Sequence, residues 1–145
     1  FESRFIELAG HINSGMPRFV VELVVAALSE QRKPLLDARV HLFGVAYKPG
    51  VGDVRESPAI DIAHLLQRGG AVVSYSDPHV PRVNHAGLEL EAIPCEVALE
   101  QGFDCGVITT GHPEFDYAAI AERSVCLVDT CNALRGLSGD HIRRL

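Results

Sequence analysis

The sequence lacks the short motifs that identify the best-known nucleotide and metal sites. Its 145 residues contain no GxGxxG fingerprint, no GxxxxGKS/T phosphate loop, no GxSxG and no HExxH. Gly44, Gly50 and Gly52 are close in sequence, but their spacing fits neither phosphate motif. The seven histidines and four cysteines show no tight ligand spacing, so we predict no metal site.

The sequence also lacks membrane, secretion and disulfide signals. No apolar run approaches the roughly 20 residues of a membrane span, and no basic segment followed by an apolar one resembles a signal peptide. The cysteines form no CxxC pair, and Cys126 lies inside an apolar run, as a reduced thiol does. We therefore expect a soluble protein in a reducing, cytoplasmic setting, with no membrane partner.

An excess of positive charge is missing as well. Thirteen basic and nineteen acidic side chains give a net charge of −6, which leaves no overall field for nucleic acid, although local cationic pockets remain possible. The 47% apolar content is enough for one main domain. The sequence does not begin with Met and starts inside a predicted helix, so we expect it to be part of a longer protein.

A helix is predicted from Met16 to Lys33. Its apolar residues recur at helical spacing: Val20, Leu23, Val24, Ala27 and Leu28. Pro17 either begins this helix or kinks a longer one that starts near Arg4, and residues 13–15 favour a break. The helix is either a connector between domains or a cover for one face of a sheet.

Strands and helices alternate through the rest of the chain. Strands are predicted at 40–47, 71–75, 104–110 and 125–129, with a short one around 88–93; helices are predicted from Pro58 to Gly69, at 95–101 and at 115–123. This order predicts an α/β fold: a doubly wound, mainly parallel, Rossmann-like sheet with helices on both faces, preceded by an N-terminal helix. Ligands are expected beyond the carboxyl ends of the strands.

The segment 44–58 is unusually polar for a strand-to-helix connection. It carries Lys48, Arg55 and Glu56 and ends at Ser57, the predicted N-cap of the next helix. Three other strand ends, 77–79, 109–112 and 129–132, are expected at the same edge of the sheet. Cationic side chains beside a helix N-terminus predict an anionic ligand, such as a phosphate or carboxylate.

Each candidate residue also has a purely structural interpretation. Lys48 is compatible with a solvated loop lysine, and Arg55 with pairing to Glu56 or capping of the loop. The structural interpretation is favoured for two turn formers, a histidine and an ordinary thiol: Asp77, Asp129, His112 and Cys131.

Five segments, in this order, resemble the nucleotide-sugar dehydrogenase family. They are 5–13, 16–17, 44–58 (GVAYKPGVGDVRESP), 75–78 and 128–130. Familiar members of the family are UDP-glucose 6-dehydrogenase, UDP-N-acetylmannosamine dehydrogenase and GDP-mannose dehydrogenase. The match covers nearly the whole chain, and its long central motif is specific.

The resemblance implies a three-part enzyme, of which this chain is the last portion. Residues 1–33 would be the end of a central helical region used in homodimerisation, and residues 38–145 a UDP-sugar-binding α/β domain. NAD would be bound mainly by an upstream N-terminal domain, which would also be a partner of this chain. The catalytic cysteine would lie upstream too, so this chain would hold no catalytic residue.

The resemblance also implies roles for three residues. Tyr47 and Lys48 match positions that contact the UDP-sugar, and Arg55 matches one that reaches toward NAD. The family oxidises the C6 alcohol of the sugar to a carboxylate in two hydride transfers, through a cysteine-linked thiohemiacetal and thioester, and so makes polysaccharide precursors. The chain alone is expected to bind the UDP-sugar without turning it over.

One departure from the family pattern follows Asp129 and Thr130, where the family commonly has Arg and this sequence has Cys131 and Asn132. Either a neighbour such as Arg135 substitutes, or the specificity differs, or binding is weaker. The sequence does not identify the sugar. An alternative function is a non-catalytic anion-binding or protein-interaction module on a flavodoxin-like scaffold.

Overall fold

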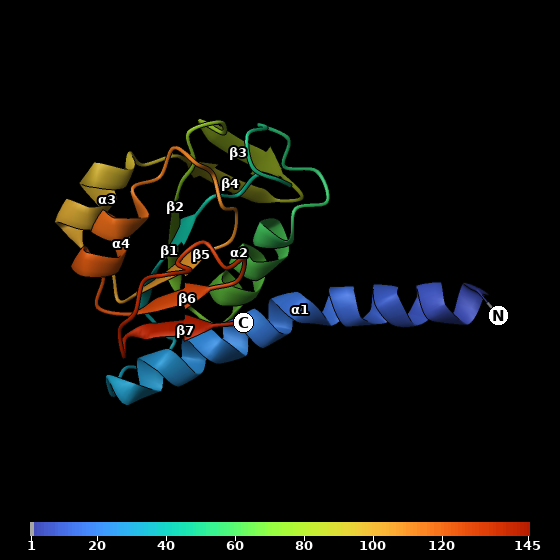
Figure 1. Ribbon diagram of the computed structural model, residues 1–145, viewed down its shortest axis with the longest axis horizontal. Coiled ribbons are helices and arrows are strands. Elements are labelled where there is room, and N and C mark those ends of the chain that lie inside the picture. The colour runs from blue at the N-terminus through green and yellow to red at the C-terminus, as the bar shows by residue number, and fades with distance from the viewer. Residues whose placement is uncertain (1) are drawn as a thin grey trace.

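The computed structural model describes the backbone of residues 2–145 and the side chains of residue 4 and residues 14–145. Within these residues, five parallel strands form one sheet, in the order β2-β1-β5-β6-β7 (Figure 1). The strands are β1 (Arg39–Phe43), β2 (Val72–Ser76), β5 (Cys105–Ile108), β6 (Leu127–Asp129) and β7 (Ile142–Arg144). The helices are α1 (Glu2–Glu30), α2 (Pro58–Arg68), α3 (Cys95–Gln101) and α4 (Tyr117–Arg123). The predicted doubly wound α/β fold is confirmed.

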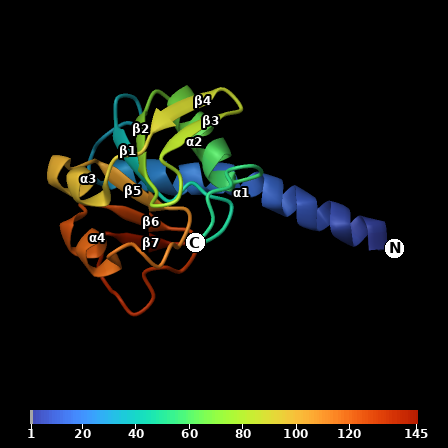
Figure 2. The same cartoon turned by 90° about the horizontal axis from the view of Figure 1, so that it is seen from above.

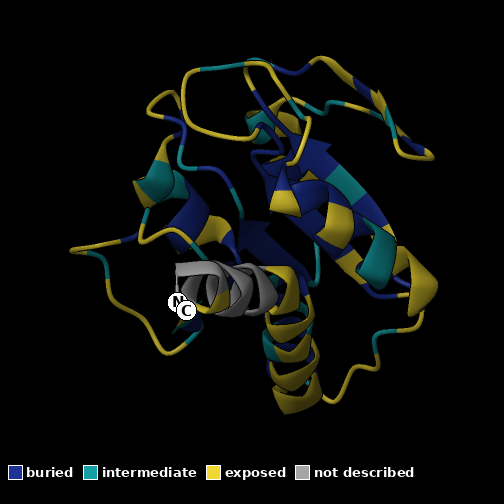
Figure 3. Ribbon diagram, turned by 90° about the vertical axis from the view of Figure 1, so that its right-hand side faces the viewer, coloured by how far each residue is buried: buried dark blue, intermediate teal, exposed yellow. Residues whose placement is uncertain are grey.

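Helices cover both faces of the sheet. Side chains alternate between the two faces along each strand, so neighbouring residues of one strand join different buried clusters. Val40 and Leu42 belong to a buried cluster with residues of α1 and α2. Phe43 belongs to a second cluster, with residues of α3 and α4. Figure 2 shows α3 and α4 on one side of the strands and α2 on the other, and Figure 3 shows the strands buried between them.

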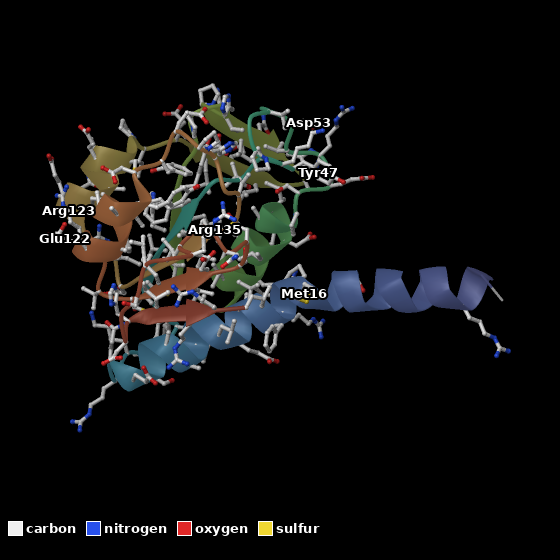
Figure 4. All side chains as sticks on the ribbon, in the orientation of Figure 1. Met16, Tyr47, Asp53, Glu122, Arg123 and Arg135 are labelled. Carbon is white, nitrogen blue, oxygen red and sulfur yellow. The ribbon has the colours of Figure 1, made fainter. Side chains whose placement is uncertain are left out.

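The helix α1 is continuous through Pro17, so the predicted break at residues 13–15 is wrong and the alternative of a longer, kinked helix is right. Figure 1 shows α1 changing direction about halfway along, and Figure 4 labels Met16 there. A proline inside a helix removes a single backbone hydrogen bond and can bend the helix without ending it. Among the described residues, no helix combines the length and hydropathy needed to cross a bilayer.

Sequence prediction misses two short strands, β3 (Arg82–His85) and β7, whereas β4 (Leu88–Glu91) lies within the short strand predicted around 88–93. The antiparallel hairpin of β3 and β4 turns at Ala86 and Gly87, which both have positive φ. Such a turn usually carries Asn or Asp before the glycine, and alanine here hides the signal. β7 is short and buries only one of its side chains, Ile142.

His41 lies inside β1 and is a structural residue. Its two ring nitrogens bond to Ser74 Oγ at 2.7 Å and Ser76 Oγ at 2.8 Å, and its ring stacks on Phe103. Burial lowers the pKa of His41 to about 4, so the ring is neutral near pH 7. This histidine therefore belongs to the core of the sheet and not to a ligand site.

Replacing Leu28 by alanine tests how far α1 belongs to the domain. Leu28 is fully buried against the sheet and α2, so Leu28→Ala should lower the free energy of unfolding by about 2 to 5 kcal/mol. Val25, three residues earlier, is 39% exposed, and Val25→Ala should change the free energy of unfolding by less than about 0.5 kcal/mol. Urea denaturation measures both; equal effects would mean that α1 does not stabilise the domain.

Candidate functional site

The loop 44–57 leaves β1 through a glycine that no other residue can replace without strain. Gly44 has φ +85°, and a Cβ there would lie 2.5 Å from Thr110 Cβ. Its N–H donates to Ser76 O at 2.8 Å. This turn ends β1 at Phe43, so the predicted strand 40–47 is too long. The loop therefore begins tightly packed between the ends of β2 and β5.

Asp77, at the end of β2, fixes the first residues of the loop. Its Oδ2 accepts hydrogen bonds from Val45 N at 2.8 Å and Ala46 N at 3.2 Å. Its Oδ1 accepts from His79 N at 2.8 Å, the turn-forming bond predicted for this residue. His112 Nε2 lies 2.9 Å from Oδ2, and both side chains are fully buried. One carboxylate thus connects three loops.

His112 extends this network to the tip of the loop. Its Nδ1 accepts a hydrogen bond from Gly50 N at 3.1 Å, so the neutral ring carries its proton on Nε2 and donates it to Asp77. Close packing adds a second constraint, because a Cβ at Gly52 would lie 2.6 Å from His79 O. His112 therefore supports the loop 44–57 through both of its ring nitrogens.

The far end of the loop begins α2 as predicted. Ser57 Oγ accepts a hydrogen bond from Ala59 N at 3.3 Å and lies 3.4 Å from Ala46 O, to which it donates. Pro58 is the first helical residue, where its missing N–H has no cost. The Ser57 cap therefore joins the two ends of the loop.

A cavity of about 510 Å³ lies beyond the carboxyl ends of β1, β5 and β6. It brings together residues from three of the four predicted strand ends, and Asp77 of the fourth is buried beside it. Its lining residues are Tyr47, Lys48, Pro49, Thr109, Thr110, Gly111, Tyr117, Cys131, Asn132, Ala133 and Arg135. The strand order reverses between β1 and β5, because β2 lies on one side of β1 and β5 on the other. Such a switch point is where α/β sheets bind ligands.

A neighbouring cavity of about 500 Å³ shares Thr109 and Cys131 with the first but has a different character. Its lining includes the acidic residues Glu56 and Asp61 and no lysine or arginine. An anionic ligand therefore prefers the first cavity, where Lys48 and Arg135 supply positive charge.

Arg55 does not line the first cavity and lies on the outer part of the loop. Its side chain is 79% exposed and pairs with Asp53 at 2.8 Å. One structural alternative from the sequence paired Arg55 with Glu56, whereas the structure pairs it with Asp53. Hydrogen bonds from Arg55 lower the pKa of Asp53 to about 2. Figure 4 labels Asp53 on this outer part of the loop.

Cys131 and Arg135 both line the first cavity, on the segment between β6 and β7. Burial and the nearby Asp129 carboxylate raise the pKa of the Cys131 thiol to about 11, so it is neutral near pH 7 and a poor nucleophile. Asp129 itself accepts from the backbone N–H groups of Cys131, Ala133 and Leu134, as a turn former does. Sequence reasoning missed Tyr117, because no local pattern links α4 to the cavity.

Comparison with known proteins agrees with this geometry. Residues 41–136 match the UDP binding domain of the UDP-glucose/GDP-mannose dehydrogenase family, over more than half of the chain. The chain belongs to this family. The matched region of this UDP-binding domain includes the whole loop 44–57 and every residue that lines the first cavity.

Relatives and solved structures point the same way. The chain is 34% identical over 110 residues to UDP-N-acetyl-D-mannosamine dehydrogenase of Pyrococcus horikoshii, covering 76% of this chain and 24% of that protein. It is 32% identical over 115 residues to that of Methanococcus maripaludis strain C7, covering 78% and 25%. The solved Pyrococcus horikoshii structure superposes with a TM-score of 0.79 at 27% identity, covering 96% of this chain and 32% of that one. The chain thus spans about a quarter of the length of these curated relatives.

Removing the Asp77 carboxylate should destabilise the UDP-binding domain. Asp77→Ala leaves two loop amides and the buried His112 ring without their acceptor, which should lower the free energy of unfolding by about 3 kcal/mol or more. Chemical denaturation measures the change. Asp140→Ala, at an exposed turn, is the control and should be nearly neutral. Comparable stability of the two variants would contradict the assigned role of Asp77.

The pair of Asp53 and Arg55 can be tested by a titration. Carbon NMR of the Asp53 carboxyl group should give a pKa of about 2 in the unaltered chain. Arg55→Gln removes the hydrogen bonds that stabilise the carboxylate, so this pKa should rise toward its ordinary value. An unchanged pKa in the variant would show that Arg55 is not held by Asp53.

Proposed function

We propose that this chain is the UDP-sugar-binding part of an NAD-dependent nucleotide-sugar 6-dehydrogenase. Family membership supports this, and the observation that carries it is the cavity at the switch point of the sheet, with Lys48 and Arg135 in its lining. Two cations in one cavity suit the diphosphate of a nucleotide sugar. The complete enzyme would oxidise the C6 alcohol of a UDP-hexose to a uronate, for polysaccharide precursors.

Each cavity residue has a role in this proposal. Tyr47 is 55% exposed and offers an apolar ring surface with a hydroxyl group to the UDP-sugar. Lys48 stabilises the negative charge of the ligand. Arg135 supplies the second cation, in the cavity where Cys131 stands in place of the arginine that is common in the family. Together these residues orient the sugar for chemistry carried out by groups outside this chain.

Arg55 fits a contact with a cofactor held elsewhere. The chain has no GxGxxG loop, so the main NAD site belongs to the upstream domain in this proposal. The guanidinium of Arg55 is exposed, away from the first cavity, and free to turn from Asp53 toward a phosphate of NAD. NAD supplies the hydride acceptor for the reaction, and this chain supplies binding, orientation and exclusion of water.

The same proposal extends to the organisation of the full protein. Residues 1–33 would end the central helical region of a homodimer, and residues 38–145 would be the UDP-sugar-binding domain. The enzyme would work in the cytoplasm. With the catalytic cysteine and the main NAD site upstream, the chain by itself would bind its ligand but not oxidise it.

Calorimetric titration with UDP tests the proposed ligand. The unaltered chain should bind UDP at one site, detected by the heat of binding. Lys48→Ala should weaken UDP binding by about tenfold or more, because one charge-assisted hydrogen bond contributes about 1.5 to 3 kcal/mol. Arg135→Ala should act in the same direction if Arg135 supplies the second cation.

Matched controls are available in the chain. Lys33 pairs with Asp104 at 2.6 Å, near the start of β5, and Lys33→Ala should leave UDP binding unchanged. Arg123 lies on α4, apart from Arg135 (Figure 4), and Arg123→Ala should also bind normally. No heat at millimolar UDP, or equal affinity in the Lys48 and Lys33 variants, would contradict the proposal. UDP binding in a full-length protein without NAD-dependent oxidation would favour the non-catalytic module.

A further inference from the structure

Two histidines and a glutamate lie close together next to the loop 44–57. They are outside the first cavity, which is the proposed UDP site and is called the UDP cavity below. His79 follows β2, and His112 and Glu114 lie between β5 and α4. One possible ligand atom of each residue lies within 4.8 Å of the other two. The His112 side chain is fully buried, while His79 and Glu114 are 32% and 42% exposed. The cluster is therefore both ordered by the fold and open on one side.

His79 Nε2 faces the Glu114 carboxylate. The two groups are within ion-pair distance, and the ring nitrogen is shielded from solvent. An imidazole nitrogen and a carboxylate oxygen at this separation are two donors that a single metal ion accepts. A cation between the two groups would accept the nitrogen lone pair and offset the carboxylate charge together.

His112 is held as a metal ligand commonly is. A ligating histidine usually donates its other ring N–H to a carboxylate, and His112 donates Nε2–H to Asp77 at 2.9 Å. Ligation through Nδ1 keeps this bond and displaces only the N–H of Gly50, an exposed residue of the loop. Ligation through Nε2 would disturb both hydrogen bonds. The count of hydrogen bonds therefore favours Nδ1.

The geometry points to a site for one divalent transition-metal ion, bound by His79, His112 and Glu114, with zinc as the best match. Two imidazoles and a carboxylate are a donor set that zinc accepts, whereas magnesium and calcium prefer oxygen alone. Of the three proposed ligands, Glu114 lines a neighbouring cavity of about 470 Å³, together with Asp77 and Pro78. This site is independent of the UDP-sugar and of NAD.

The ion would tie together the loops that support the UDP cavity. His79 belongs to the loop after β2, and Gly52 packs against its carbonyl oxygen. His112 and Glu114 belong to the loop after β5, whose Thr110 and Gly111 line the UDP cavity. A bound ion would therefore hold the loops after β2 and β5 at fixed separation, and Gly52 of the loop 44–57 packs against the first of them.

Zinc titration of the chain, prepared without a polyhistidine tag and freed of metal by a chelator, tests the site. Calorimetry should give one zinc ion per chain, and zinc should raise the midpoint of thermal unfolding. His79→Gln and Glu114→Gln should each weaken zinc binding by about tenfold or more, because loss of even a supporting residue costs about 10- to 100-fold. Both side chains are partly exposed, so both variants should fold, as circular dichroism would verify.

Control variants and a spectroscopic readout separate this site from others. His85→Gln in the hairpin and Glu122→Gln on α4 (Figure 4) should bind zinc normally. Cobalt bound by nitrogen and oxygen should give visible d–d absorption without a thiolate charge-transfer band. Absence of zinc binding, full affinity in the His79 or Glu114 variant, or a thiolate band that places the ion on a cysteine would each overturn the proposal.

Discussion

The buried carboxylate of Asp77 is the interaction on which the carboxyl edge of the sheet depends. It accepts hydrogen bonds from the loop after β1, from its own turn after β2 and from His112 after β5. Tyr47 and Lys48 follow directly after the two amides, Val45 and Ala46, that it holds. The buried Asp77 carboxylate thus fixes the backbone that positions the solvent-exposed side chains of Tyr47 and Lys48.

Positive charge in this domain acts locally against an acidic background. The net charge of the chain is −6, yet Lys48 and Arg135 share one cavity that has no acidic residue in its lining. Arg55, a few residues away, is neutralised by Asp53 in this structure. The fold therefore brings together two cations from different segments of the chain. The fold, and not the composition, creates this local positive charge.

Sequence reasoning succeeds here where the signal is local. Ser57 and Gly69 mark the two ends of α2, and the structure places both as caps of that helix. It fails where the decisive partner is distant or the pattern is weak. Residues 13–15 look like a helix break, but α1 runs through them, although Ser14 and Gly15 are exposed and the core residues of α1 lie farther along the helix. Asp77 reads as a turn former, and its pairing with His112 spans 35 positions, so no local rule reveals it.

The buried core extends beyond the region that sequence similarity outlines. The family match covers residues 41–136, but Val24 and Leu28 of α1 are buried in one core cluster and Ile142 of β7 in the other. A piece cut at the limits of the match would expose an apolar sheet face and leave β6 as an open edge, which invites strand addition between copies. The smallest portion of this protein worth excising for study therefore runs from the middle of α1 through β7.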